Sequence, residues 1–306
     1  MRIGLYISTA GNAPLDAVIR RFETAEALGF DTAWVGHTFD WDALGLLALA
    51  GRATQRIELG SWVVPTFPRH PLALAQQALT VQRAAAGRLA LGIGVSHTAV
   101  VGKRMGLDDR RPLRHMRGVL DVLPDLLRGE RVDYRGETLR ISAALETGEA
   151  TAPPVVLAAL GPRMLELAGE RADGVAIWLG GPKFLEQFAL PHIERGAARR
   201  DTGAPRVLSG LPICVTHSPA ARDGADRLLA LSAKLPAYRR VLEREGATSP
   251  GAVAIAGDES SVARRLEAIA ALGVTDFNAV LFPVDGDPEA ESRTRDFLAT
   301  LSIGAA

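Results

Sequence analysis

The sequence contains a single cysteine, Cys214, and only three lysines, Lys103, Lys183 and Lys234, among 306 residues. One cysteine excludes an intramolecular disulfide framework and a cysteine-rich zinc site. The 35 basic residues are balanced by 35 acidic ones, so there is no surplus of positive charge to bind nucleic acid or an anionic membrane. No apolar run approaches the roughly 20 residues that span a bilayer. We therefore expect a cytoplasmic globular protein whose partner is a small-molecule substrate.

Short apolar runs alternate with longer amphipathic stretches along most of the chain. Strands are expected at 3–7, 32–36, 57–64, 89–95, 155–159, 174–179, 207–216 and 276–282, and most precede a stretch with helical spacing. Eight such units favour an α/β fold of the closed (β/α)8 TIM barrel type, although an open doubly wound sheet would show the same alternation. We predict one TIM-barrel domain over 1–306, with insertions around 96–111 and 220–255, the second before the last βα unit.

The predicted strand ends carry the residues of greatest interest, because the active site of a TIM barrel lies at the carboxyl ends of its strands. These ends hold glycines, apolar side chains and two histidines, His37 and His97. They contain no carboxylate cluster and no set of side chains with metal-ligand spacing, so no metal site is predicted. An apolar rim with glycines suits a planar heteroaromatic ring, because glycine lets the backbone approach the ring face.

Each candidate at the strand ends also has a purely structural interpretation. Gly161-Pro162 begins a predicted helix, where free N–H groups can hold an anion such as a cofactor phosphate, but Gly-Pro more commonly makes a turn. His37 and His97 can act as acid, base or hydrogen-bond donor, or can be structural histidines. Trp62 and Trp178 can enclose a ring or fill the barrel mouth.

Several segments stand in a fixed order along most of the chain. They are GFDTAWVGH at 29–37, RIELGS at 56–61, RHPLALA at 69–75, GRLALGIG at 87–94 and ADGV at 172–175. At these spacings they resemble the luciferase-like monooxygenase superfamily, whose members are (β/α)8 barrels that use flavin or deazaflavin. AALGPRM at 158–164 and AGDE at 256–259 make the chain most similar to the bacterial branch that uses the deazaflavin coenzyme F420.

The resemblance implies a set of cofactor contacts. Trp62-Val63 matches a bulge of the third strand behind the deazaflavin ring, often formed through a non-prolyl cis peptide. Val95 and Ser96 match positions beside the ring, and Leu160-Gly161 matches backbone amides that hold the phosphate. The cofactor-binding residues that we predict are Trp62, Val63, Gly94, Val95, Ser96, Ala159, Leu160, Gly161, Trp178, Leu179 and Gly180.

The two histidines depart from the family pattern. His37 stands where relatives often have an acidic residue, and His97 where some reductases and dehydrogenases have a catalytic glutamate. We predict His37 and His97 as the catalytic residues, because an imidazole titrates near working pH and can give or take the proton that accompanies hydride transfer.

The predicted function is that of an F420-dependent oxidoreductase, which transfers a hydride between C5 of the cofactor and an apolar alkene, imine or ketone. The segment 96–111 would form a mobile wall over the site. Two alternatives stay open: an FMN-dependent luciferase-like monooxygenase on the same barrel, and a barrel that binds a ligand without catalysis. The resemblance also implies a homodimer.

Overall fold

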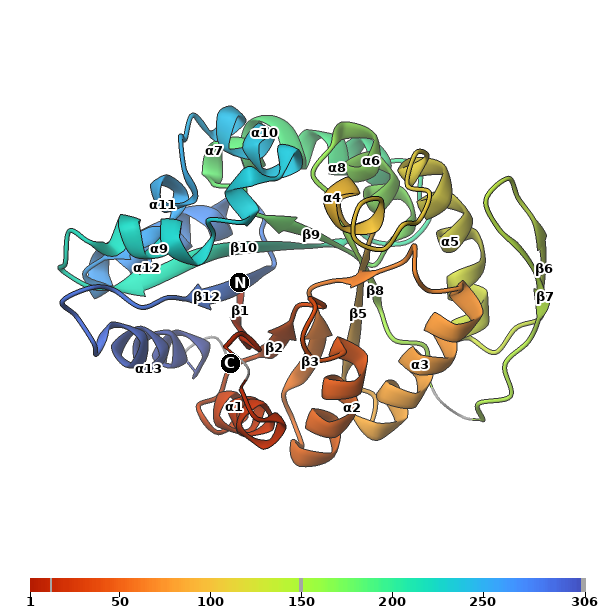
Figure 1. Cartoon of the computed structure of the whole chain (residues 1–306), viewed down its shortest axis with the longest axis horizontal. Coiled ribbons are helices and arrows are strands. Elements are labelled where there is room, and N and C mark those ends of the chain that lie inside the picture. The colour runs from red at the N-terminus through yellow and green to blue at the C-terminus, as the bar shows by residue number, and fades with distance from the viewer. Residues whose placement is uncertain (12, 149–150, 304–306) are drawn as a thin grey trace.

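The centre of the molecule is a closed barrel of parallel strands (Figure 1). The computed structural model describes residues 1–11, 13–148 and 151–303, so parts of the predicted domain 1–306 lie outside the described residues. In order around the barrel the strands are β1 (Arg2–Tyr6), β2 (Thr32–Val35), β3 (Glu58–Ser61), β5 (Leu89–Gly94), β8 (Val155–Ala158), β9 (Gly174–Trp178), β10 (Arg206–Val215) and β12 (Asp276–Leu281). Pairing of β12 with β1 and of β9 with β10 closes the ring. The predicted (β/α)8 TIM barrel is confirmed.

Helices follow the strands and cover the outside of the barrel. They are α1 (Leu15–Ala27), α2 (Ala43–Ala53), α3 (Pro71–Ala84), α5 (Pro112–Leu127), α6 (Pro162–Arg171), α7 (Pro182–Phe184), which continues through the π-helical turn η1 (Leu185–Ala189) into α8 (Leu190–Ala197), and then α12 (Glu259–Ala271) and α13 (Ala290–Ile303). Their starts follow local rules. Asp42 accepts a hydrogen bond from the Gly45 N–H at 2.8 Å at the start of α2, and α3, α5 and α6 each have a proline in the first turn.

The predicted insertions contain short helices of their own. Segment 96–111 holds α4 (Thr98–Val101). Segment 220–255 holds α9 (Ala221–Leu228), η2 (Ser232–Lys234), α10 (Pro236–Glu245) and α11 (Pro250–Val253), and leads into β11 (Ile255–Gly257), which pairs with the end of β10.

The elements that were not predicted include the hairpin of β6 (Val132–Arg135) and β7 (Arg140–Ala143), the helices α4 and α13, and the strand β11. The strand predicted over 57–64 is also not continuous, because it breaks at Trp62-Val63 into β3 and a short β4 (Val64–Pro65) that pairs with β5.

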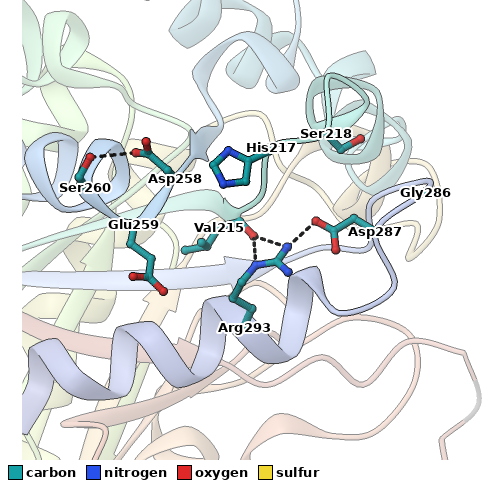
Figure 2. Close-up of a pocket in the computed structure, with 9 residues that line it drawn as sticks. All are labelled: Val215, His217, Ser218, Asp258, Glu259, Ser260, Gly286, Asp287 and Arg293. Carbon is teal, nitrogen blue, oxygen red and sulfur yellow. Dashed lines mark hydrogen bonds and ion pairs between the residues drawn. The ribbon is translucent and has the colours of Figure 1, made fainter.

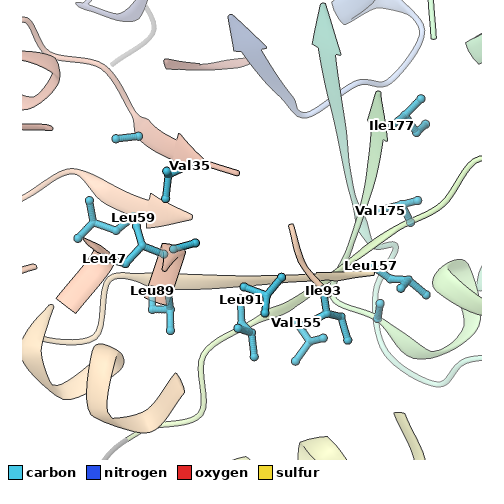
Figure 3. Close-up of a cluster of buried hydrophobic side chains, with 14 of the residues drawn as sticks. Val35, Leu47, Leu59, Leu89, Leu91, Ile93, Val155, Leu157, Val175 and Ile177 are labelled. Carbon is cyan, nitrogen blue, oxygen red and sulfur yellow. The ribbon is translucent and has the colours of Figure 1, made fainter. Parts of the chain in front are cut away.

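The outward faces of the strands form the main core with the helices. Figure 3 shows Leu59, Leu91, Leu157 and Ile177, from four neighbouring strands, in one cluster with Leu47 of α2. All five side chains are fully buried. Because side chains alternate along a strand, the residues between them face the barrel interior and are available to shape the site.

Ion pairs close the barrel at the amino ends of its strands. Arg206 reaches Glu58 at 2.9 Å and also pairs with Asp276, while Arg2 pairs with Glu58 at 3.0 Å and with Asp276 at 3.4 Å. The Asp276 carboxylate is 3% exposed. The polar end of the barrel is therefore sealed, which leaves the carboxyl ends of the strands as its mouth.

Candidate functional site at the barrel mouth

Two tryptophans form the floor of the mouth. Trp62 lies edge-on against Trp34, with ring centroids 5.4 Å apart. Trp62 and Trp178 also converge on the backbone of Gly210, where a Cβ would lie 2.8 Å from one ring and 2.9 Å from the other. Both rings are only partly buried. Their inner sides therefore pack against the barrel interior, and their outer sides present an apolar surface at the mouth. The two tryptophans can thus fill the mouth and also contact a bound ring.

The bulge after β3 brings Val63 against Gly94 of β5. The Trp62-Val63 peptide is cis, as the family resemblance led us to expect. A Cβ at Gly94 would lie 2.9 Å from the Val63 side chain and 3.4 Å from Ala158. Glycine at position 94 is thus required for this close approach, and the residues that were predicted to flank a ring, Val63, Gly94 and the neighbouring Val95, lie together.

Two predicted site residues have left-handed backbone conformations. Ser96 has φ 59° and Leu179 has φ 62°, a region that residues with a side chain adopt rarely and that occurs preferentially at functional sites. Leu179 follows β9 directly, and Ser96 is the second residue after β5. Ala159 and Leu179 are 2% and 0% exposed, so in this structure both lie behind the surface that a ligand would meet.

The two candidate histidines differ in what their rings contact. The His37 Nδ1 accepts a hydrogen bond from the Ala43 N–H at 3.3 Å, and its Nε2 lies 3.4 Å from an Arg69 nitrogen. Burial, followed by the charge of Arg69, lowers its pKa. The His97 ring makes no hydrogen bond within the described part of the chain and lies edge-on against Tyr238, with centroids 4.8 Å apart. His37 is therefore anchored at the start of α2, whereas the nitrogens of His97 are free for a ligand.

A small cavity lies at the start of α6, where the phosphate site was predicted. It measures about 140 Å³ and is lined by Leu160, Gly161, Pro162, Phe184, Phe188, Ala237, Arg240, Val241 and Arg244. No side chain caps α6, and a Cβ at Gly161 would meet no atom within 4 Å. Pro162 has no N–H and the Met164 N–H donates to the Gly161 carbonyl, so the N–H groups of Gly161 and Arg163, which have no acceptor in the described part of the chain, are the ones open to an external anion.

Helix α10 places two cations beside this open helix start. Among the residues that the structure describes, no carboxylate pairs with Arg240 or Arg244, and the Arg244 guanidinium stacks 4.0 Å from the Phe188 ring centroid. The neighbouring helix α7, by contrast, is capped by Glu245, which accepts a hydrogen bond from the Phe184 N–H at 2.7 Å. The start of α7 is thus occupied by the carboxylate of Glu245. The start of α6 has two arginines beside it and, among the described residues, no carboxylate.

Sequence reasoning missed the three side chains that α10 contributes, Tyr238, Arg240 and Arg244. The spacing of the arginines, four residues apart, places them on one face of a helix and was the only signal in the sequence. This spacing does not predict which part of the barrel the arginine-bearing face of the helix contacts.

A larger cavity of about 830 Å³ lies outside the mouth, beyond the end of β10 (Figure 2). Arg293 donates hydrogen bonds to the Val215 carbonyl at 3.0 and 3.1 Å and also pairs with Asp287. Thr216 donates to Asp287 at 2.5 Å. The central charges of this cavity therefore satisfy one another, and none of the predicted site residues lines it.

Within residues 1–11, 13–148 and 151–303, no three His, Cys, Asp or Glu side chains are grouped as a metal site would require. None of the helices in the same ranges has the length and apolar character of a membrane span.

Comparison with known proteins gives the chain relatives over its whole length. The methylenetetrahydromethanopterin reductase of Archaeoglobus fulgidus is 27% identical over 277 residues, which cover 87% of this chain and 80% of the relative. The structure of the coenzyme F420-dependent tetrahydromethanopterin reductase from Methanopyrus kandleri has a TM-score of 0.82 at 24% identity, covering 99% of this chain and 97% of that one. A type II Baeyer–Villiger monooxygenase from Pseudomonas putida, in complex with FMN, has a TM-score of 0.75 at 15% identity, with 98% and 96% covered.

Residues 1–289 match the family described as luciferase-like monooxygenase. With the closed barrel and this match over nearly the full length, the chain is an enzyme that belongs to the luciferase-like monooxygenase family.

Proposed function

We propose that the protein is an F420-dependent oxidoreductase that binds the coenzyme across the barrel mouth. The observation that carries this proposal is the cavity at the start of α6, which Gly161, Arg240 and Arg244 line together. This donor set fits a phosphate group, since helix starts and guanidinium groups both bind phosphate oxygens. The apolar surface of Trp62 and Trp178 would seat the ring, with Val63, Gly94, Val95 and Ser96 beside it.

The coenzyme, when bound, supplies hydride chemistry at C5, and the protein supplies orientation and protons. Leu160 and Gly161 would hold the phosphate through backbone amides, and the buried residues Ala159, Leu179 and Gly180 would support its path from behind. His97 would handle the proton, because its ring nitrogens are free. His37 would fix the loop after β2 through Ala43 and Arg69.

F420 is favoured over FMN by the charge around the cavity. Both cofactors carry a phosphate, but F420 has a long acidic tail beyond it. Arg163, exposed in the first turn of α6, adds a further cation at this helix start. The similarity to the reductases of the two archaea also supports F420 as the cofactor. The similarity to the FMN-bound structure leaves an FMN-dependent monooxygenase as the alternative.

Titration of the purified protein with each cofactor tests this proposal. We expect F420 to bind more tightly than FMN, measured by quenching of tryptophan fluorescence. Reduced F420 should then be oxidised in the presence of at least one member of a panel of ketones, imines and alkenes, since the mouth is apolar. Tighter binding of FMN would favour the monooxygenase, and F420 binding with no turnover would favour a barrel without catalysis.

A homodimer is part of the proposal, because Leu49 on α2 is 47% exposed although it is apolar. Light scattering on the purified protein measures the mass directly, and a monomer of 32.4 kDa would contradict a dimer.

The charge state of His97 gives a pH prediction. Burial lowers the pKa of His97 below its ordinary value of 6.5, so the unfolded chain binds a proton at this residue before the folded protein does. We expect the His97 imidazole to be neutral at pH 6.5 and above, and its protonation at lower pH to reduce stability. NMR titration, with the His97 signal identified by its loss in His97→Gln, measures the midpoint. A midpoint at or above 6.5 contradicts the prediction.

A further inference from the structure

Tyr238 lies over the barrel mouth although it comes from the 220–255 insertion. Its ring contacts the His97 ring at the end of β5, at an interplanar angle of 71°. It also lies near Tyr6, the last residue of β1, which contributes to raising the Tyr238 pKa. Strands β1 and β5 are separated in the barrel by β2 and β3. The ring contact with His97, together with the proximity of Tyr6, therefore places Tyr238 above the mouth, between its two sides.

The hydroxyl of Tyr238 is available to a ligand. The side chain is partly buried, and its hydroxyl forms no hydrogen bond with any protein group in the described part of the chain. The Tyr238 hydroxyl is not among the buried polar atoms that lack a partner, so it is accessible to solvent and to a ligand. Burial, and then the neighbouring Tyr6, raise the pKa of Tyr238, so the phenol stays protonated and is a hydrogen-bond donor.

The position of Tyr238 is fixed by its helix. Val241 and Leu242 of α10 are buried in the core, 1% and 4% exposed. Glu245 ties the end of the helix to the start of α7. A donor on a rigid element holds its geometry better than one on a loop.

We propose that Tyr238 is a catalytic residue of the reaction assigned above, on which this inference rests, and that it donates the proton to the reacting heteroatom of the substrate. The substrate is then a ketone or an imine rather than an unconjugated alkene, because only a polar double bond offers an oxygen or nitrogen to this donor.

The step balances in atoms and electrons. The carbon of the double bond takes the hydride of the reduced coenzyme, and the π electron pair moves to the oxygen or nitrogen. The O–H bond of Tyr238 breaks as the new bond from hydrogen to that atom forms. The tyrosinate regains a proton from solvent, with the His97 imidazole as the titratable group beside its ring, and in the reverse direction each transfer is inverted.

The substitution Tyr238→Phe tests the assignment, because it keeps the ring against His97 and removes only the hydroxyl. We expect kcat for ketone or imine reduction to fall about 100-fold, with the dissociation constant of F420 unchanged. Tyr134→Phe is the matched control. Its hydroxyl donates to Asp121 at 3.0 Å on the outer hairpin, and it should leave kcat unchanged.

Each outcome supports or overturns the inference. Loss of kcat with intact coenzyme binding supports it. Full kcat in Tyr238→Phe, or faster turnover of unconjugated alkenes than of ketones and imines by the wild-type protein, overturns it while the proposed function stands. A wild-type protein that does not bind F420 overturns the proposed function and this assignment with it.

Discussion

Replacement of both Arg240 and Arg244 by methionine is expected to weaken F420 binding about 100-fold, which corresponds to about 3 kcal/mol. The two guanidinium groups line the cavity at the start of α6 and have no carboxylate partner among the described residues. Methionine keeps an apolar stem of similar length, so the stack on Phe188 and the packing of α10 are largely retained. Fluorescence titration of wild-type and variant proteins measures the change.

Arg239→Met provides the matched control. Arg239 is adjacent in the sequence, exposed and on the same helix, but it does not line the cavity. Arg239→Met removes one positive charge, as Arg240→Met or Arg244→Met alone does. A general electrostatic effect on F420 binding would therefore appear in Arg239→Met too. The affinity of the wild-type protein should also fall as salt is raised, since exposed charges are screened. Equal effects of Arg239→Met and Arg240→Met would contradict a specific anion site.

Arg206→Met is expected to lower the free energy of unfolding by about 3–5 kcal/mol. Arg206 pairs with both Glu58 and Asp276 at the closed end of the barrel, and its side chain is 25% exposed. Removal leaves the Asp276 carboxylate, which is 3% exposed, with Arg2 alone for compensation. A buried charge that loses a partner is costly, because water cannot replace that partner. Urea denaturation followed by circular dichroism measures the loss.

The surface pair of Arg110 and Asp108 serves as the comparison for this variant. These side chains are 84% and 63% exposed at a separation of 2.8 Å. Arg110→Met should change stability by no more than about 0.5 kcal/mol, because water already solvates both charges. The burial of Asp276 indicates that the ion pairs inside the barrel contribute to stability. A loss of unfolding free energy in Arg206→Met no larger than that in Arg110→Met would contradict this contribution.

The barrel could be predicted from the sequence because its strands are continuous apolar runs that are buried on both faces. The strands expected at 89–95 and 276–282 agree with β5 and β12 to within one residue at each end. The hairpin of β6 and β7 lacks this signal, since it is short and only Val132 and Ile141 are buried in it. Its pattern resembles that of a polar loop.

The candidate site could be predicted only in part, for a geometric reason. Residues at strand ends, such as Trp62 and Gly94, are brought together by the barrel itself, so their position in the sequence predicts their position in space. Tyr238 and Arg240 lie in an insertion, and its path across the mouth depends on tertiary contacts such as that of Glu245 with the start of α7. No spacing in the sequence encodes that contact.

Helix α10 combines a cap for its neighbour, two cations and a phenol within ten residues. Each residue along a helix is rotated by about 100° from the one before it, so a single insertion or deletion ahead of Tyr238 would turn all of these groups away from their partners at once. The proposed roles of α10 in coenzyme binding and in proton donation would therefore be lost together, and an exchange of this segment between homologues would transfer both or neither.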